Sequence, residues 1–215
     1  MPKLKPDTQL ARRTRILDAA ELCFARAGFH RTTMADICME AGISAGALYV
    51  HFTSKEALIA GIAERNRAKL ADELREVAAA PDLVAALSRL GEHYTVEEPQ
   101  YKRVLCLEIG VEATRNPVVG EIYRAVDGFC KESFTALLER AVAEGKIRPV
   151  RDCATIAETL AMIGDGLFWR RAIDPSFDAK AMLPVLDAIV SGLLNPVAPA
   201  AEAAPEPAKP DKTRA

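Results

Sequence analysis

The feature that most constrains the fold is a run of three short helical patterns between Arg12 and Ile59. The second and third patterns are separated only by Glu40-Ala41-Gly42-Ile43-Ser44, where the glycine allows a sharp turn and the serine can cap the next helix. Small residues open the third pattern, and Tyr49 and His51 close it. Two helices joined by so short a turn are typical of a helix-turn-helix, so this segment is predicted to read DNA.

The remainder of the chain also follows helical rather than strand periodicity. Capping residues, prolines and glycines divide the whole sequence into about nine expected helices, and Pro184 is expected to kink or delay the last. The predicted helices span about residues 7–27, 34–41, 44–50, 54–79, 82–96, 100–114, 117–144, 152–172 and 178–194. Thr53-x-x-Glu56 is read as the capping box of the fourth.

The predicted fold is therefore all-α, with three parts. Residues 1–53 form a three-helix helix-turn-helix DNA-binding domain, and residues 54–194 form a helical ligand-binding and dimerisation domain. Residues 195–215 are rich in proline and alanine and lack large apolar residues, which predicts a disordered tail.

Charge distribution is more informative than total charge. The net charge of −2 does not by itself indicate a nucleic-acid partner. Residues 1–31, however, carry seven lysines and arginines against three acidic residues. A locally basic N-terminal part is the electrostatic pattern expected of a module that contacts phosphates.

Several function classes are not supported by any motif. The three histidines are not spaced as metal ligands, and phosphate-binding, dinucleotide-binding and nucleophile-elbow motifs are absent from the sequence. An enzyme, a metal and a cofactor are therefore not expected. No apolar run approaches the roughly 20 residues that cross a bilayer, so no membrane partner is expected either. The five cysteines are interpreted as small buried residues in a reducing cytoplasm, with a thiol redox sensor as the alternative.

The third helical pattern supplies most of the candidate DNA contacts. Its small residues would let the backbone approach base edges, and the start of the second helix can offer N–H groups to a phosphate. The candidate DNA-binding residues are Thr33, Ser44, Ala45, Gly46, Ala47, Tyr49, His51 and Lys55. Alternative roles are a core aromatic for Tyr49, a helix-end cap for His51 and a solvated charge for Lys55.

The segment TTMADICMEAGISAGALYVHFTSKEAL resembles the N-terminal domain of the TetR family of one-component transcriptional regulators. The resemblance covers roughly residues 10–60, and the rest of the chain matches the family only in length and helicity. It implies phosphate contacts for the positions of Thr33, Tyr49, His51 and Lys55, with residues 44–47 facing the groove. Val50 departs from the aromatic residue that the family often has there. Because Ala45 and Ala47 cannot hydrogen-bond through their side chains, base readout is expected to rely on apolar contacts and DNA shape.

A single reader contacts few base pairs, so two copies reading a pseudo-palindrome are expected. Apolar residues recur at helical spacing near the C-terminal end, where the family places a four-helix dimer interface. A face buried within one protomer is the alternative. The candidate dimerisation residues are Ile156, Leu160, Ile163, Leu167, Met182, Leu186, Ile189 and Leu193.

The resemblance also implies an inducer cavity among the fourth to eighth helices. Carboxylates within apolar runs are costly to bury, which makes them site candidates. The candidate ligand-binding residues are His93, Tyr94, Glu108, Asp165, Phe168 and Trp169. The alternatives are an ion pair with an arginine for Glu108, an interface or capping hydrogen bond for Asp165, and core packing for Phe168 and Trp169. Acids beside aromatic rings would suit an apolar or aromatic, cationic small molecule, as in the control of multidrug efflux.

These observations predict a cytoplasmic, ligand-responsive repressor that binds its operator as a homodimer and is released by a small-molecule inducer. The alternative is a constitutive DNA-binding regulator whose helical body only dimerises or recruits a partner.

Overall fold

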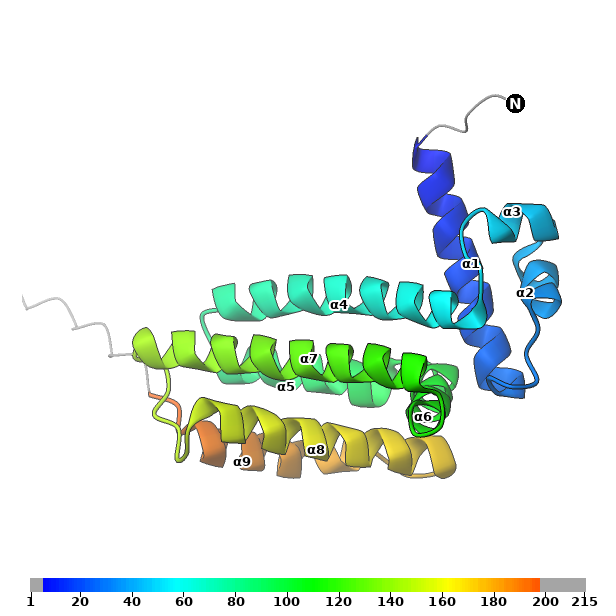
Figure 1. Cartoon of the computed structure of the whole chain (residues 1–215). Helices are drawn as coiled ribbons and strands as arrows, with labels where there is room; N and C mark the ends of the chain where they lie inside the picture. The colour runs from blue at the N-terminus through cyan, green and yellow to red at the C-terminus, as the bar shows by residue number, and fades with distance from the viewer. Residues whose placement is uncertain (1–5, 198–215) are drawn as a thin grey trace, which may run out of the picture.

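The computed structural model describes residues 6–197, which fold into nine α-helices with no strand (Figure 1). The prediction of an all-α fold is confirmed. The α-helices are α1 (Pro6–Ala27), α2 (Met34–Ala41), α3 (Ala45–Tyr49), α4 (Lys55–Ala79), α5 (Leu83–Glu92), α6 (Gln100–Ala113), α7 (Pro117–Ala143), α8 (Cys153–Ile173) and α9 (Leu183–Leu194). A π-helical turn, η1 (His93–Glu97), follows α5, and a 3-10 turn, η2 (Lys180–Met182), precedes α9.

The helices of the N-terminal domain begin and end where the sequence signals predict. Thr33 caps α2 through a reciprocal capping box, in which its Oγ1 accepts from the Asp36 amide at 3.1 Å and its own amide donates to the Asp36 carboxylate at 2.8 Å. Gly42 ends α2 with a left-handed backbone, φ 63°, and Ser44 caps α3. The tight turn between the two helices is therefore built from local interactions.

Two predicted boundaries needed correction, and a third was confirmed. Ser54, not Thr53, is the N-cap of α4, because Ser54 has the extended backbone and its Oγ accepts from the Ala57 amide at 3.2 Å. The predicted helix over residues 82–96 changes to π-helical geometry at His93, and the Glu98 amide donates to the carbonyl oxygen of His93. The delayed start of the last helix is confirmed, with Pro184 in the first turn of α9.

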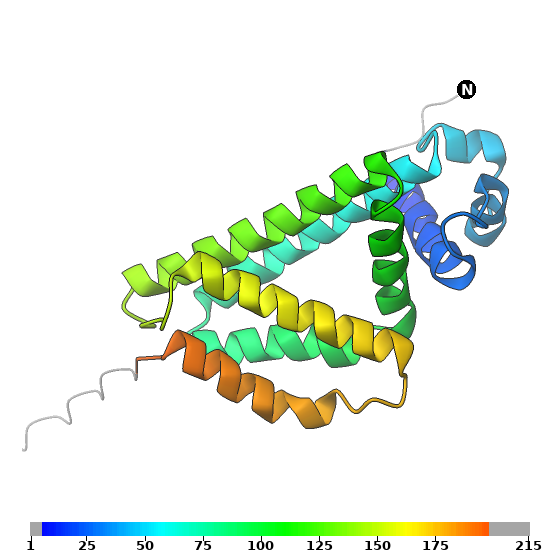
Figure 2. The same cartoon turned by 60° about the horizontal axis from the view of Figure 1, so that its bottom comes forward.

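The helices form a small head and a long body (Figures 1 and 2). Helices α1 to α3 make the head at one end, and α1 runs steeply across the start of α4. Helices α4 and α7 lie side by side along the body, α8 and α9 form its opposite side, and α6 crosses the end nearest the head. The head is thus attached directly to α4 and α6.

Two separate hydrophobic cores hold this arrangement together. The first joins the head to Leu58, Ile59 and Ile62 of α4 and to the adjoining parts of α6 and α7. The second lies at the far end of the body, where the last part of α4 meets α5, α7, α8 and α9. The first core includes residues on both sides of residue 53, so no gap in packing separates the two expected domains there.

Between the two cores the long helices contribute almost no fully buried side chains. Residues 63–73 of α4, 121–136 of α7 and 158–173 of α8 are all half-buried or exposed. A packed helical body would bury one stripe of each of these helices. The middle of the body is therefore loosely filled.

The chain end follows α9 closely. The amide of Val197 donates to the carbonyl oxygen of Lys146 at 2.9 Å, and Pro196 forms a β-bridge with Ile147. The first residues of the predicted disordered tail are therefore ordered, and residues 198–215 of it lie outside the part that the structure describes.

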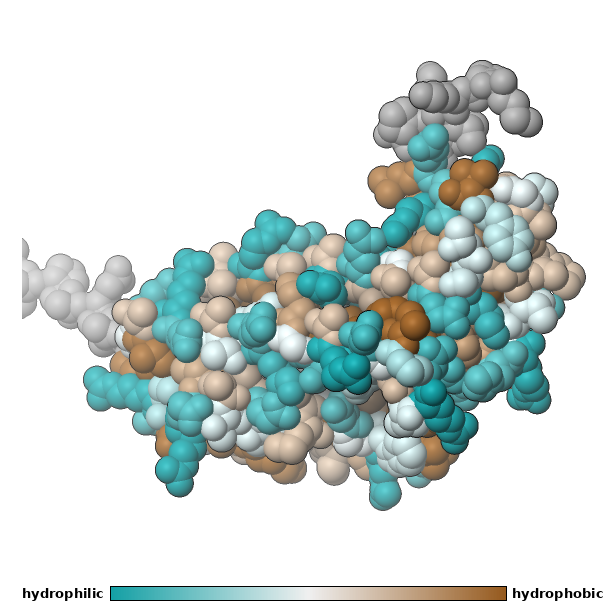
Figure 3. All heavy atoms as spheres, in the orientation of Figure 1, coloured by the Kyte–Doolittle hydropathy of each residue, from teal (hydrophilic) through white to brown (hydrophobic). Residues whose placement is uncertain are grey.

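The surface over α4 and α7 carries mostly polar and neutral residues, with hydrophobic ones in separate spots (Figure 3). Among the helices of residues 6–197, none combines the length and the apolar character that a bilayer span requires.

Candidate DNA interface and ligand cavity

Helix α3 is held to the head by one buried side chain and leaves the rest of its surface free. Leu48 is fully buried in the first core, whereas Ser44, Ala45 and Gly46 are exposed and Ala47 is half-buried. Tyr49 is 51% exposed, so the alternative role of a core aromatic is wrong. A short helix with an accessible backbone is the geometry that fits a major groove.

The start of α2 can offer backbone N–H groups to a phosphate, but the amide of its N-cap, Thr33, is not among them. The amide and hydroxyl of Thr33 both donate to the Asp36 carboxylate, and these hydrogen bonds lower the pKa of Asp36. The free amides of the first helical turn belong to the residues that follow the cap. A phosphate at this helix end would therefore meet the amides of Met34 and Ala35.

A cleft between α1 and α3 contains two residues that sequence reasoning missed. It is lined by Ala47, Val50 and His51 from the helix-turn-helix and by Gln9 and Arg12 from the first turns of α1. The local excess of basic residues in the sequence pointed to this part of the chain, but only the fold shows which side chain meets α3.

Among the side chains of residues 9–197 the Arg12 guanidinium has no acidic partner, whereas its neighbour Arg13 pairs with Glu64 at 2.7 Å. Arg12 is thus the basic side chain of this cleft that remains available to a phosphate.

Lys55 is already engaged by the protein. Its ammonium donates to the backbone carbonyl oxygens of Phe29 and His30 and lies 4.3 Å from the centre of the Phe29 ring. Lys55 thus ties the start of α4 to the loop between α1 and α2, and it is not simply a solvated charge. A contact with a phosphate would use its remaining N–H.

Glu108 does not face the interior of the body, which corrects its assignment to the ligand cavity. Its Oε2 accepts from the Phe29 amide at 3.4 Å and lies against Gly28. The same side of α6 carries Glu112, whose buried carboxylate lies 2.8 Å from Nε2 of His30. This side of α6 is therefore committed to the head, and Glu108 forms no ion pair with an arginine of the described residues, which was its alternative role.

Trp169 is also placed elsewhere than expected. It is 56% exposed on the outside of α8, on one helical stripe with Met162 and Ile173, so both cavity lining and core packing are wrong for it. Phe168 is half-buried on the inner side of the helix. Neighbouring positions on one helix point about 100° apart, so the rings of Phe168 and Trp169 face different surroundings.

We call the loosely packed middle of the body, between the two cores, the hollow, and Cys106 of α6 lies beside it. The Cys106 side chain has accessible surface, yet burial raises its pKa to about 11, and Asp165, Glu98 and Cys130 raise it further. These neighbours come from α8, from the η1–α6 connection and from α7. Asp165 and Cys130 belong to the sparsely buried stretches of α8 and α7, so Cys106 borders the loosely packed region between the two cores.

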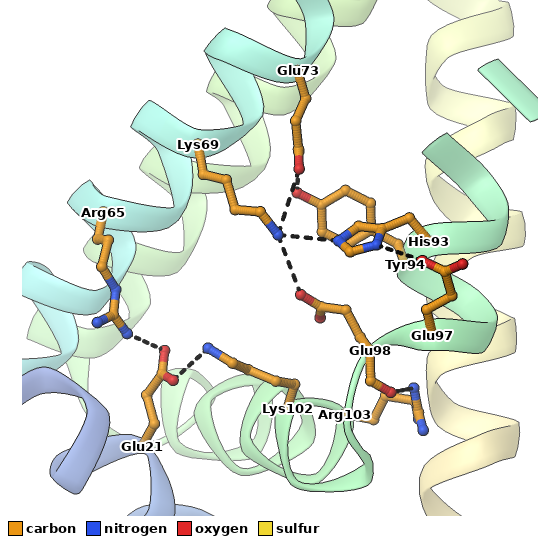
Figure 4. A network of polar contacts seen from close by, with 10 residues as sticks. All are labelled: Glu21, Arg65, Lys69, Glu73, His93, Tyr94, Glu97, Glu98, Lys102 and Arg103. Atoms are coloured by element: carbon orange, nitrogen blue, oxygen red, sulfur yellow. Dashed lines mark hydrogen bonds and ion pairs between the residues drawn. The ribbon is translucent and has the colours of Figure 1, made fainter. Parts of the chain in front are cut away.

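Two of the predicted ligand-binding residues lie around this hollow. Burial raises the pKa of Tyr94, whose hydroxyl donates to Glu73 at 2.5 Å. Burial, followed by the charges of Asp127 and Glu158, raises the pKa of Asp165. His93 instead lies at the outer edge, where its ring is 3.2 Å from the Lys69 ammonium and 3.0 Å from the Glu97 carboxylate (Figure 4).

The predicted dimerisation stripe divides into two groups. Ile163, Leu167, Met182 and Leu186 line an open apolar groove between α8 and α9, and Ile189 is 40% exposed beside it. Ile156 is 1% exposed in the second core, so its assignment to an interface is corrected. Leu160 and Leu193 pack partly against that core, because α8 and α9 converge there on α5 and α7.

Comparison with known proteins agrees with this architecture. Residues 16–62 match the family described as bacterial regulatory proteins, tetR family, and residues 85–195 match the family described as BetI-type transcriptional repressor, C-terminal. The chain is 30% identical over 187 residues to the HTH-type transcriptional regulator UidR of Escherichia coli, covering 85% of this chain and 93% of UidR.

Solved structures show the same arrangement of helices. Salmonella enterica GusR has a TM-score of 0.75 and 32% identity, covering 89% of this chain and 98% of that one. A structure described as a SmeT–triclosan complex has a TM-score of 0.70 and 26% identity, covering 91% and 100%. With both parts of the chain matched, this protein belongs to the TetR family of bacterial regulatory proteins.

Proposed function

We propose that this protein is a ligand-responsive repressor that binds a pseudo-palindromic operator as a dimer in the cytoplasm and is released by a small-molecule inducer. The observation that carries the proposal is the hollow between the two cores, bordered by the same long helix, α4, that begins in the core of the DNA-reading head. A body that served only to dimerise would have no need of such a space.

The groove between α8 and α9 supports the dimer. Its apolar lining is exposed in a single chain, and a second copy placed on it would bury Ile163, Leu167 and Leu186. Two heads would then be held at a fixed separation, as a two-fold symmetric operator requires.

Release follows if the ligand moves α4. This helix passes from the first core to the second along the hollow, so a ligand that displaces its middle also shifts the head. The change in affinity must be reciprocal: operator DNA weakens the ligand by the same factor, typically about 5–150-fold.

The sparsely buried stretches of α7 and α8 carry the half-buried Phe129 and Phe168, which favours an apolar or aromatic ligand. SmeT, at 26% identity, is described in complex with the small molecule triclosan, which supports a ligand in a body of this fold. A cationic ligand and control of multidrug efflux were expected from Glu108, Asp165 and Trp169, and that hypothesis now rests on Asp165 alone.

The proposal is tested by selecting genomic DNA fragments with the purified full chain, with and without a panel of antimicrobials and metabolites. We expect a palindromic sequence to be recovered and at least one compound to release it. A palindrome released by no compound would favour the constitutive regulator, and no enrichment at all would contradict the role of α3.

A further inference from the structure

Two arginines meet inside the body without a carboxylate partner. Arg103 of α6 is 3% exposed and Arg171 of α8 is half-buried, and within residues 6–197 neither forms an ion pair. Burial lowers the pKa of Arg103, and the charge of Arg171 lowers it further. Because arginine does not lose its proton in proteins, both positive charges persist side by side.

The two guanidiniums bind the end of the π-helical turn instead. Nη1 of Arg171 donates to the carbonyl oxygens of Thr95 and Val96. Nη1 of Arg103 donates to the carbonyl oxygen of Glu98 at 2.6 Å (Figure 4). Nη2 of Arg103 makes a longer contact of 3.3 Å with the Gln100 amide oxygen. Carbonyl dipoles at a helix end partly offset positive charge, but they supply no full negative charge.

Part of each guanidinium is left without an acceptor. The Nε atoms of Arg103 and Arg171 are both buried without a hydrogen-bond partner, and Nη2 of Arg171 donates to no group in the described part of the chain. Buried polar groups are nearly always hydrogen-bonded. The edge formed by Nε and Nη2 is one that accepts an oxyanion through two parallel bonds, and in Arg171 the whole edge is unused.

The nearest carboxylates are committed to other groups. Glu98 lies 3.6 Å from the Lys69 ammonium, and Glu73 accepts from Tyr94 and lies 3.4 Å from the same ammonium (Figure 4). Neither neutralises the arginine pair by direct contact.

The pair adjoins the hollow. Cys106, which faces the hollow, lies one turn beyond Arg103 on α6, and the charge of Glu98 acts on both residues. A group that fills the hollow is thus within reach of the arginines.

We propose that Arg103 and Arg171 form a receptor for an oxyanion, a carboxylate or a phosphate, carried by the molecule that occupies the hollow. This rests on the proposed function in that the hollow is taken as the inducer site. The side chains turn their Nε–Nη2 edges to the anion and loosen their hold on the carbonyls of η1. The inducer is then an amphipathic organic anion, whose apolar part lies among the half-buried aromatic residues.

The proposal is tested by thermal unfolding of the full chain in inorganic phosphate or in acetate, with sodium chloride holding the ionic strength constant. The variant Arg171→Gln removes the unused edge. Arg151→Gln, at an exposed position just before α8, removes the same charge and serves as the matched control.

We expect at least one anion to raise the Tm of the wild-type chain saturably, by about 3–5 °C at tenfold above its Kd. Arg151→Gln should keep this increase and Arg171→Gln should lose it. The anion whose effect on Tm saturates at the lower concentration, phosphate or acetate, shows which type of oxyanion the arginines prefer.

Equal stabilisation of all three proteins would reveal a general salt effect and overturn the proposal, as would no stabilisation of the wild type. If Arg171→Gln does not fold, Arg171→Lys keeps the charge without the two-pronged edge and should bind the anion at least tenfold more weakly. In addition, the Nε–H resonances of Arg103 and Arg171 should move saturably during the titration, and unmoved resonances would contradict the assignment.

These readouts need no operator. A chain that binds the operator but ignores anions overturns only the anion receptor, whereas a chain that binds anions but no operator overturns only the repressor.

Discussion

Oε1 of Glu21 in α1 lies 2.7 Å from Nη2 of Arg65 in α4 (Figure 4). The Glu21 carboxylate is only 1% exposed, and its other oxygen accepts from the ammonium of Lys102 in α6. One buried charge therefore joins the head to both helices that lead into the body. Such a charge is stable only while its partners remain in place, so moving α4 or α6 relative to α1 disturbs it directly.

The variant Glu21→Gln should lower the free energy of unfolding by roughly 2–4 kcal/mol. The Arg65 guanidinium and the Lys102 ammonium would lose their shared carboxylate partner at a largely buried site. Denaturant unfolding measures the change. Glu64→Gln is the matched control: it removes the exposed partner of Arg13 and should cost less than about 1 kcal/mol. Similar losses in the two variants would mean that burial of Glu21 has no energetic importance.

Tyr49→Ala should abolish operator binding without unfolding the protein, because the side chain projects from α3 and contributes little to the core. Fluorescence anisotropy with operator DNA and circular dichroism check the two parts of this statement. Val142→Ala removes an apolar surface residue at the far end of α7 and should leave binding unchanged. Normal binding by a folded Tyr49→Ala would remove this residue from the interface.

Arg12→Ala should weaken operator binding about equally for all sequences and reduce the slope of log K against log salt by about 1, since one phosphate contact is lost. Arg15→Ala deletes the same charge from an exposed position of α1 outside the cleft, and it should change the slope less. Identical slopes for the two variants would show that the cleft lined by Arg12 and His51 does not hold a phosphate.

Leu186→Glu should convert the proposed dimer to monomers, because two copies would each place a carboxylate in the apolar groove between α8 and α9. Sedimentation velocity at several concentrations measures this directly. Ile156→Val, in the second core, should instead lower stability by about 0.5–1.5 kcal/mol and leave the association state unchanged. A dimeric Leu186→Glu protein would place the interface elsewhere.

Asp165→Asn should raise stability at pH 7. Burial and the charges of Asp127 and Glu158 raise the pKa of Asp165 above its ordinary 3.8, so the folded chain holds this proton to higher pH than the unfolded chain. Folded-state stability therefore falls as pH rises from about 3.8 to the raised pKa, and it remains lower above that interval. The advantage of the variant should shrink as pH is lowered toward 4, as followed by Tm.

Asp174→Asn should change stability at neutral pH in the opposite direction. Hydrogen bonds from the Ser176 hydroxyl and amide lower the pKa of Asp174, so its contribution is present at neutral pH and is lost as pH falls through the folded pKa. This variant should be less stable than the wild type at pH 7, and the gap should close in acid. A common pH response of the two variants would contradict both assignments.

The head could be predicted closely from sequence because its signals are local. The capping box at Thr33, the left-handed turn at Gly42 and the cap at Ser44 each involve residues within a few positions of one another. The start of α4 was placed at Thr53 instead of Ser54, an error of a single residue between two good capping types.

The site residues of the body were harder to predict, since the role of each depends on which helix packs against its own. Periodicity put Glu108 and Ile156 on apolar stripes, but it could not tell that the first meets the head and the second meets the far core. The exposure of Trp169 and the meeting of Arg103 with Arg171 are likewise set by the crossing of α6 and α8. No spacing within one helix encodes such a meeting.

The separation of the two cores determines which parts of the protein tolerate substitution. Stability resides at the two ends, and the stretches that border the hollow owe little of theirs to close packing. A substitution there removes few packed contacts, so it costs less than the same substitution in either core. A preference for one small molecule over another at the proposed ligand site could accordingly change through substitutions in the middle of the chain, while the helix-turn-helix keeps its shape.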